Sequence, residues 1–260
     1  MAKKTALITG GSAGIGFELA KVFAAHGHDV VLVARHLDTL EAAAGKIEGK
    51  YGVKAMTLPF DLSNPESPQR LFDVVTGEGL RIDFLINNAG FGLGGEFADT
   101  DIDKELDMIQ VNVSSLVHLT KLFLPAMIKR KEGRIMNIAS TAAFQPGPLA
   151  SIYYATKAFV LSFSEAIAEE LRHTGVTVTA LCPGPTHTNF SERAGTEKTR
   201  LFTQSVVASA EGVARFGYTA MMRGQRVAIP GMANKLIPQG GRILPRRLIS
   251  FLARKVQENR

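Results

Sequence analysis

Short apolar runs alternate with longer helical patterns along this chain of 260 residues, and this alternation limits its fold more than any other feature. The runs Thr5–Thr9 and Asp29–Ala34 lack the polar alternation of a strand with one wet face, so they are typical of strands buried on both faces. Further strand-like runs are Val53–Phe60, Phe84–Asn87, Arg134–Ala139, Val176–Leu181 and Val227–Ile229.

Helical patterns separate these runs, as a parallel sheet requires. They cover Ile15–His26, Leu37–Tyr51, a stretch that begins at Pro65 after Asn64, two stretches within Asp103–Lys131, and Ser151–His173. The alternation predicts an α/β fold, a Rossmann-type doubly wound parallel sheet of about seven strands with helices on both faces. We expect residues 1–260 to form a single domain.

Composition excludes several classes of protein. The single cysteine, Cys182, excludes a disulfide framework, and the six histidines show no metal-ligand spacing, so we expect no metal site. No apolar run approaches the roughly 18 residues of a membrane span, so we expect no transmembrane segment and a cytoplasmic protein. Of the net charge of +6, the segment 242–260 carries +5, so no basic face remains on the body and we expect no nucleic-acid partner.

A glycine-rich turn follows the first expected strand and opens the first helix. It contains Gly10, Gly14 and Gly16, with Ser12, Ala13 and Ile15 between them. Glycines allow the backbone to approach a diphosphate closely, and the N-terminus of a helix attracts its charge. No Gly-Lys-Ser/Thr follows, so the turn is not an ATP-type phosphate loop. This position in an alternating chain favours dinucleotide binding over a purely structural turn.

The second expected strand ends in Ala34-Arg35-His36, with no acidic residue before Asp38. An acid at this place accepts from the ribose hydroxyl of NAD, whereas an arginine suits the 2′-phosphate of NADP. A solvated arginine at a strand end is the alternative. We predict NADP(H) as the coenzyme, with Arg35 as the discriminating residue.

Tyr153 and Lys157 are four residues apart at the start of a long expected helix, so they share one face of it. A nearby ammonium favours the phenolate and would adapt tyrosine to acid–base work. Tyr154 has no lysine four residues later. Ser140 directly follows a strand, at the sheet edge where such folds bind ligands, and Asn112 is an unusual residue inside a helical stretch, where a special role or a bend is expected.

Together these motifs resemble those of the short-chain dehydrogenase/reductase family, over about residues 4–190. The turn Thr9–Gly16, the element Asn87-Asn88-Ala89-Gly90, the run Pro183-Gly184-Pro185-Thr186 and the pair Asp61-Leu62 match family motifs. Asn112, Ser140, Tyr153 and Lys157 match its catalytic tetrad in order and spacing.

The resemblance implies a role for each matched residue. Tyr153 transfers the hydroxyl proton, Lys157 lowers the tyrosine pKa and binds the nicotinamide ribose, Ser140 orients the substrate carbonyl, and Asn112 holds a water. The coenzyme contacts that it implies are Gly10, Ser12, Ala13, Gly14, Ile15, Gly16, Arg35, Asp61, Leu62, Asn88, Ala89, Gly90, Tyr153, Lys157, Pro183, Gly184 and Thr186.

These roles predict an NADP(H)-dependent carbonyl reductase or alcohol dehydrogenase acting on a small-molecule ketone, aldehyde or secondary alcohol. Phenylalanines after the strands indicate an apolar substrate, and with Ser140 and Tyr153 we expect Phe91, Phe144 and Phe190 to contact it. The segment 188–208 is the expected substrate lid. A 3-oxoacyl thioester reductase and a non-catalytic dinucleotide-binding regulator remain as alternatives, and the family implies a homodimer or homotetramer.

The C-terminal extension 242–260 contains an amphipathic pattern. After Pro245 we predict a helix over Arg246–Gln257, with an apolar stripe made of Leu248, Ile249, Phe251, Leu252 and Val256. We expect this stripe to pack on its own domain or on another subunit. A peripheral contact with anionic lipid is the alternative, because basic residues flank the stripe.

Overall fold

The chain is described by a computed structural model over residues 3–188, 207–236 and 245–258. Its centre is a seven-stranded sheet in the order β3-β2-β1-β4-β5-β6-β9, in which every neighbouring pair is parallel. The strands are β1 (Thr5–Thr9), β2 (Asp29–Ala34), β3 (Ala55–Pro59), β4 (Phe84–Asn87), β5 (Gly133–Ile138), β6 (Val176–Leu181) and β9 (Val227–Ala228). The predicted doubly wound fold is confirmed.

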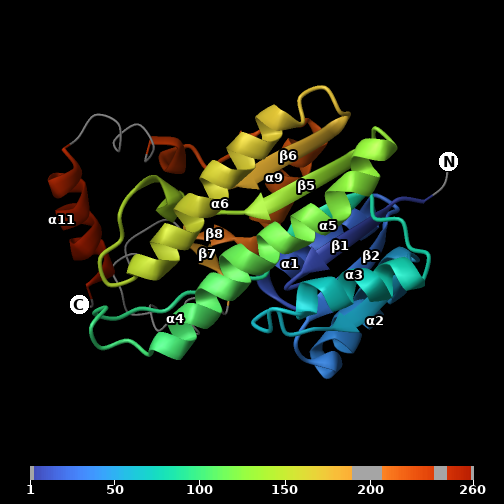
Figure 1. Ribbon diagram of the computed structural model, residues 1–260, viewed down its shortest axis with the longest axis horizontal. Helices are drawn as coiled ribbons and strands as arrows, with labels where there is room; N and C mark the ends of the chain where they lie inside the picture. Colours follow the sequence, from blue (N-terminus) through green and yellow to red (C-terminus); the bar gives the residue numbers. More distant parts are fainter. Residues whose placement is uncertain (1–2, 189–206, 237–244, 259–260) are drawn as a thin grey trace.

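Helices cover both faces of the sheet (Figure 1). On one face lie α1 (Gly14–Ala25), α2 (Leu37–Tyr51) and α9 (Ala210–Met222), whose buried side chains form one core cluster with the strands. On the other lie α3 (Ser67–Gly77), α5 (Leu116–Lys129) and α6 (Ser151–Glu170), which contribute to a second cluster. The continuous apolar runs read from the sequence are thus explained, because β1, β2 and β4 are buried on both sides.

Three details of the sequence-based assignment are wrong. The helix expected from Pro65 begins at Ser67, with Pro68 in its first turn; the Asn64 carboxamide accepts from the Glu66 N–H at 2.9 Å in a turn before it. The strand expected over Val53–Phe60 is limited to Ala55–Pro59. A second small sheet was not predicted, in which β7 (Thr186–His187) pairs with β8 (Ala208–Ser209) at the end of the expected lid.

One helix is long and apolar enough to cross a membrane by length and composition, although no uninterrupted apolar run in the sequence reaches that length. In the described residues, α4 (Ile102–Ile109), a π-helical segment (Gln110–Ser115) and α5 run continuously, and this stretch is long enough, with a mean hydropathy of 1.4 in its most apolar window. Composition alone does not distinguish a spanning helix from a core helix. Here Leu119, Phe123 and Met127 pack into the core against the sheet, as in the core helix of a globular domain.

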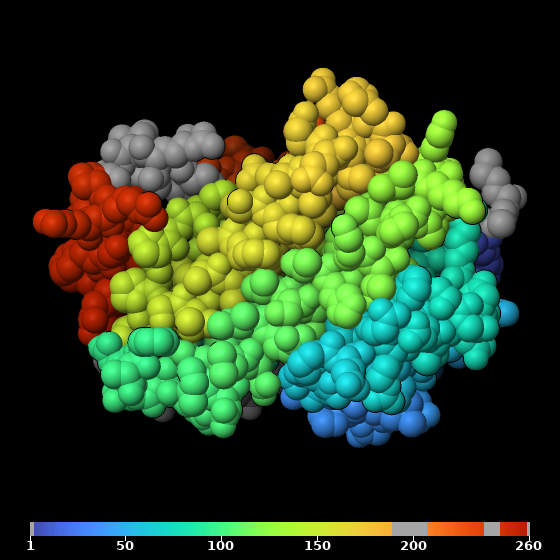
Figure 2. Space-filling model, in the orientation of Figure 1, coloured from blue at the N-terminus to red at the C-terminus, as the bar shows by residue number. Residues whose placement is uncertain are grey.

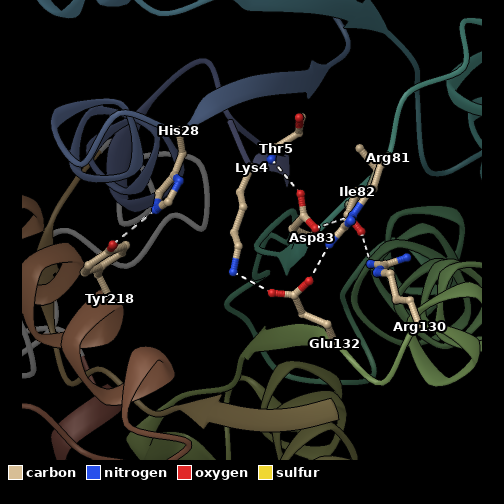
Figure 3. A network of polar contacts seen from close by, with 9 residues as sticks. All are labelled: Lys4, Thr5, His28, Arg81, Ile82, Asp83, Arg130, Glu132 and Tyr218. Carbon is tan, nitrogen blue, oxygen red and sulfur yellow. Dashed lines mark hydrogen bonds and ion pairs between the residues drawn. The ribbon is translucent and has the colours of Figure 1, made fainter. Parts of the chain in front are cut away.

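The amino-terminal end of the sheet is closed by a charged network, drawn in Figure 3. Asp83 is buried and accepts from the Thr5 N–H at 3.0 Å and from Arg81 Nε at 2.7 Å. Glu132 accepts from Lys4 Nζ at 2.7 Å and also pairs with Arg81. Opposite charges therefore fix the starts of β1, β4 and β5, the three central strands that also carry the site at their other end.

The C-terminal helix α11 spans Arg246–Gln257, as predicted, but it packs through a different face. Its buried residues are Ile249, Ala253 and Gln257, which are spaced four apart. The rest of the predicted apolar stripe is exposed. Packing was expected for the whole apolar stripe, and the structure buries only Ile249 of it, together with Ala253 and Gln257, whose side chain donates to the Tyr154 hydroxyl.

Candidate active site

The glycine turn between β1 and α1 requires glycine at several positions. Gly10 and Gly14 have φ of +65° and +56°, in the left-handed region. A Cβ added at Gly16 would lie 2.2 Å from the carbonyl oxygen of Gly10, and one at Gly10 would lie 2.7 Å from Asn88 Nδ2. The sequence motif is therefore a packing requirement as well as a binding signature.

The element after β4 holds this turn in place. The Thr9 hydroxyl oxygen accepts from the backbone N–H groups of Asn88 and Ala89, both at 2.9 Å. Asn88 Nδ2 donates to the carbonyl oxygens of Thr9 at 2.8 Å and Gly10 at 3.2 Å. The glycine turn and the element after β4 are thus in direct contact, and Asn88 and Ala89 hold the turn through hydrogen bonds. Gly90 follows them, and a Cβ there would lie 2.8 Å from Asn112 Oδ1.

The N-terminus of α1 fits a bound diphosphate. Its N-cap is Ala13, which offers no side-chain cap, and its first turn contains no acidic residue. The first N–H groups of a helix need an acceptor, and an anion supplies one. Thr188 also lies here, because a Cβ at Gly14 would meet its side chain at 3.2 Å. The sequence reading placed Thr188 only at the start of the lid, since no local pattern connects it to the turn.

Arg35 and Asp61 lie at neighbouring strand ends. Arg35 directly follows β2 and is exposed, and the Phe60 N–H donates to the Ala34 carbonyl at 2.9 Å, which joins the ends of β2 and β3. The Asp61 carboxylate accepts from the Ser63 N–H at 3.0 Å, and the carbonyl of the buried Leu62 accepts from Ser115. The sheet edge where we expect the adenosine of the coenzyme to bind thus carries the exposed cation Arg35 at the end of β2.

Ser140, Tyr153 and Lys157 converge at the carboxyl ends of β5 and β6. Ser140 caps the short 3-10 turn after β5, where its oxygen accepts from the Ala142 N–H at 3.1 Å, and it hydrogen-bonds Tyr153. Lys157 is buried, its Nζ donates to the Ile138 carbonyl at 2.8 Å, and it lies 5.7 Å from the centre of the Tyr153 ring. The spacing of four residues in α6 thus places both groups on one face, as predicted.

Burial changes the pKa values of both groups. It raises the pKa of Tyr153 well above its ordinary value, and the hydrogen bond from Ser140 only partly opposes this. It lowers the pKa of Lys157 from 10.5 to about 8. Burial is thus the largest influence on the pKa of Tyr153 in this structure, and the role of Lys157 in lowering it stays a prediction.

Asn112 lies in the π-helical segment between α4 and α5, which explains why a poor helix former interrupts a helical pattern. Its Oδ1 accepts from the Phe91 N–H at 3.1 Å, and its Nδ2 donates to the Phe91 carbonyl at 3.0 Å and to Thr156 Oγ1 at 3.1 Å. Thr156 in turn donates to the Tyr153 carbonyl at 2.7 Å. Asn112 thus connects the loop after β4 to the catalytic helix, and the sequence reading missed Thr156 as the link.

The Pro183–Thr186 run follows β6 beside Ser140. The Pro183 carbonyl accepts from the Thr141 N–H at 2.9 Å, and the Thr186 hydroxyl donates to the Gly184 carbonyl at 2.9 Å. A Cβ at Gly184 would lie 2.7 Å from the side chain of Asn234, a neighbour that the sequence reading did not identify. The run thus borders both the catalytic serine and the loop after β9.

The expected substrate phenylalanines are placed in part. Phe91 is half-buried next to Asn112, and Phe144 is half-buried against the core below β5 and β6. Phe144 also lines a cavity of about 310 Å³ between the loop after β5, α6 and α11. Phe190 and most of the lid 188–208 lie outside the described residues. Cys182 is buried, as expected for a small apolar residue, and burial raises the pKa of its thiol to about 12.

Comparison with known families decides what this arrangement is. Residues 4–199 match the model of the short chain dehydrogenase family, which covers most of the chain and all the motifs above. This chain belongs to the short-chain dehydrogenase family. Within the described residues, no group of three or more metal-ligating side chains accompanies the site.

Relatives of this short-chain dehydrogenase include two very-long-chain 3-oxoacyl-CoA reductases. The one from Coprinopsis cinerea is 38% identical over 177 residues, 66% of this chain and 52% of the relative. The one from Homo sapiens is 38% identical over 184 residues, 68% of this chain and 58% of the relative. The chain therefore spans only between half and three fifths of the length of these two proteins.

Solved structures match it over more of its length. A short-chain dehydrogenase from Sphingobium yanoikuyae, in complex with NADPH, is 34% identical and superposes with a TM-score of 0.83 over 92% of this chain and 93% of its own. The family, the fold and the uncapped glycine turn together identify a nicotinamide dinucleotide site in this short-chain dehydrogenase.

Proposed function

We propose that this protein is an NADP(H)-dependent carbonyl reductase that converts an apolar ketone or aldehyde to the alcohol, and reverses the reaction when the alcohol is in excess. One observation carries the proposal: the convergence of Ser140, Tyr153 and Lys157 at the carboxyl edge of the sheet, beside a helix N-terminus that fits a diphosphate. Such a set combines proton donors with a dinucleotide site, which is what carbonyl reduction needs.

The residues divide the chemistry among themselves. A bound nicotinamide supplies the hydride that the carbonyl carbon accepts. The Tyr153 hydroxyl gives its proton to the carbonyl oxygen, and the Ser140 hydroxyl donates to that oxygen as its negative charge develops. The raised pKa of Tyr153 keeps it protonated at neutral pH, so the resting enzyme holds the acid that reduction requires. Lys157, between Tyr153 and the Ile138 carbonyl, is placed to bind the ribose.

The preference for NADP(H) rests on Arg35, the exposed cation at the end of β2. A charge-assisted hydrogen bond to the 2′-phosphate contributes about 1.5–3 kcal/mol, which corresponds to roughly 10–150-fold in affinity. We expect NADPH to bind more tightly than NADH by that factor, and Arg35→Asp to reverse the order. Arg70→Asp, an exposed arginine on α3, is the matched control and should leave both dissociation constants unchanged. Equal constants for the wild type would contradict the preference.

A 3-oxoacyl thioester is the second candidate substrate. It is supported by the names of the relatives in Coprinopsis cinerea and Homo sapiens, which are reductases of very-long-chain 3-oxoacyl-CoA. The half-buried Phe91 and Phe144 favour an apolar body in either substrate. The two candidates differ in whether the thioester contributes to recognition.

A substrate panel tests the proposal. NADPH oxidation is followed with bulky free ketones, aldehydes, steroids and 3-oxoacyl thioesters of increasing chain length. Turnover of free ketones at kcat/KM values equal to or above those of the thioesters supports the carbonyl reductase. Turnover restricted to thioesters assigns the second candidate. NADPH binding without turnover of any member would overturn both and leave a non-catalytic dinucleotide-binding regulator.

A further inference from the structure

The C-terminal helix α11 is attached to the body by one face only. Gln257 Nε2 donates to the buried Tyr154 hydroxyl at 2.7 Å, and Arg254 pairs with Glu96 in the loop after β4. Ile249 and Ala253 complete the buried face. In Figures 1 and 2 the helix lies at the left end of the molecule, with its outer side on the surface.

The outer face of α11, which we define as Leu248, Phe251, Leu252 and Val256, is apolar and exposed. The exposed fractions of these four residues are 42%, 54%, 46% and 39%. Single exposed apolar residues are ordinary on protein surfaces, but four on a twelve-residue helix form a continuous stripe. A stripe of this kind on a helix that is already docked by another face indicates a second contact.

The helix that carries this stripe is also strongly basic. The helix contains Arg246, Arg247, Arg254 and Lys255 and no acidic residue. Of these four cations, only Arg254 has an ion pair among the described residues, with Glu96 and with Glu258. Arg246, Arg247 and Lys255 are therefore available to a partner. Lys255 Nζ lies 4.7 Å from the centre of the Phe251 ring, with its stem along the apolar stripe. The partner that this surface fits is both apolar and anionic.

Charge also decides between the two simplest occupants. A two-fold contact between copies brings the same patch of each copy together, so it would place two helices with four cations each against one another. A bilayer that contains anionic lipid accepts the apolar side chains and attracts the cations, which extend to the headgroups. A single convex helix, rather than a groove, is also the shape that lies flat in a lipid interface.

We propose that the outer face of α11 docks this protein peripherally and reversibly on an anionic lipid surface. The helix is about 18 Å long, so it lies along the interface and does not cross it. The three to four side chains of the stripe enter the boundary between headgroups and acyl chains. The catalytic end of the sheet stays outside the bilayer, connected to the docked helix through Tyr154, the neighbour of Tyr153.

Sedimentation of the full-length protein with vesicles tests the proposal. We expect binding to vesicles that contain phosphatidylserine, little binding to pure phosphatidylcholine, and release by high salt. The double variant Phe251→Glu with Leu252→Glu should lose at least about 100-fold in affinity, since each residue loses its burial. Arg247→Gln with Lys255→Gln should lose about 25-fold, at about fivefold for each cation. Phe251→Leu should bind like the wild type.

Matched controls keep the test specific. Val74→Glu introduces an acid at an exposed apolar position of α3, and Lys46→Gln with Arg223→Gln removes two exposed cations elsewhere; both should bind vesicles like the wild type. Wild-type protein that fails to bind phosphatidylserine vesicles overturns the proposal, and an acidic protein would then be the partner. Two results for Phe251→Glu with Leu252→Glu also overturn it. A smaller oligomer by light scattering would assign the face to a second copy, and a markedly lower melting temperature would assign it to packing within the chain.

Discussion

The amino-terminal end of the sheet buries an acid between donors, whereas its carboxyl end buries an ammonium and a phenol. Asp83 accepts from Arg81 and from the Thr5 N–H, so its charge is neutralised where it lies. At the other end, burial lowers the pKa of Lys157 to about 8 and raises that of Tyr153. The same three strands, β1, β4 and β5, run between these two ends.

The two ends of one sheet thus have different roles, stability at the strand starts and chemistry at the strand ends. Paired charges at the strand starts stabilise the fold. Burial of the titratable groups Lys157 and Tyr153 at the strand ends lowers the free energy of unfolding, but it places a proton donor at the site of the reaction. We therefore expect substitutions at the carboxyl end to lower activity without lowering the free energy of unfolding, and substitutions at the amino-terminal end to lower the free energy of unfolding without lowering activity.

Tyr153→Phe should give the largest effect. Removing the hydroxyl removes the proton donor, and general acids contribute about 10²–10⁴-fold to turnover. We expect that loss in kcat, with the melting temperature and the dissociation constant of NADPH nearly unchanged. Tyr218→Phe, which removes a hydroxyl from the opposite end of the sheet beside His28, is the control and should keep full activity. A Tyr153→Phe enzyme close to wild type would refute the assignment.

Asp83→Asn should show the reverse pattern. The asparagine side chain is neutral and has only one acceptor oxygen, so it cannot replace both hydrogen bonds that the Asp83 carboxylate accepts from Arg81 and the Thr5 N–H. A hydrogen bond to a charged group contributes about 1.5–3 kcal/mol. We expect the free energy of unfolding to fall by about 2–3 kcal/mol, measured by urea denaturation, with kcat/KM within about twofold of wild type. Asp107→Asn, at an exposed position of α4, should change neither. Loss of activity without loss of stability in Asp83→Asn would contradict the separate roles of the two ends of the sheet.

Lys157→Met should stabilise the protein while it abolishes turnover. The folded state holds Lys157 with a pKa of about 8, below its ordinary value of 10.5, so between these values the unfolded chain binds more protons. Stability of the wild type therefore rises as pH increases from 8 to 10.5, and below pH 8 the full cost of the buried ammonium is present. We expect the variant to gain about 1–2 kcal/mol at pH 7 and nothing near pH 10.5, by urea denaturation at each pH. A variant less stable than wild type at pH 7 would contradict this sign.

His28 should give the smallest effect. Burial and the neighbouring His26 and Lys4 lower its pKa below 6.5, so the folded protein binds fewer protons than the unfolded chain as pH falls below 6.5. Wild-type stability should decline through this acid range more steeply than that of His28→Phe. The measurement is the melting temperature of both proteins from pH 7 to pH 5. An equal decline in wild type and variant would show that His28 does not contribute to the pH dependence of stability.

The sequence could predict the sheet and the pair Tyr153 and Lys157 because both depend on local spacing, whereas Ser140 and Asn112 were assigned to the catalytic set by the family resemblance. Strands buried on two faces appear as apolar runs, and four residues on a helix bring Tyr153 and Lys157 together. The rest depends on contacts that join distant segments. Thr188 reaches the glycine turn, Asn112 reaches Thr156, and Gln257 reaches Tyr154, none of which leaves a periodic signal.

The face through which α11 packs could not be predicted for the same reason. Amphipathicity identifies the apolar stripe but not its partner, and the contacts of Gln257 with Tyr154 and of Arg254 with Glu96 join segments far apart in the sequence. Likewise, the effect of Lys157 on Tyr153 depends on how deeply both are buried, and spacing along a helix contains no information on hydration.

Transfer of deuterium from the coenzyme shows directly whether the carboxyl end of the sheet performs carbonyl reduction. NADPH with deuterium at the transferable position of C4 is incubated with the enzyme and its best ketone, and the alcohol is examined by mass spectrometry. The account predicts one deuterium in the alcohol with the wild type and with Asp83→Asn, and almost no alcohol with Tyr153→Phe. Unlabelled alcohol from the wild type, or labelled alcohol formed equally fast by Tyr153→Phe, would contradict it.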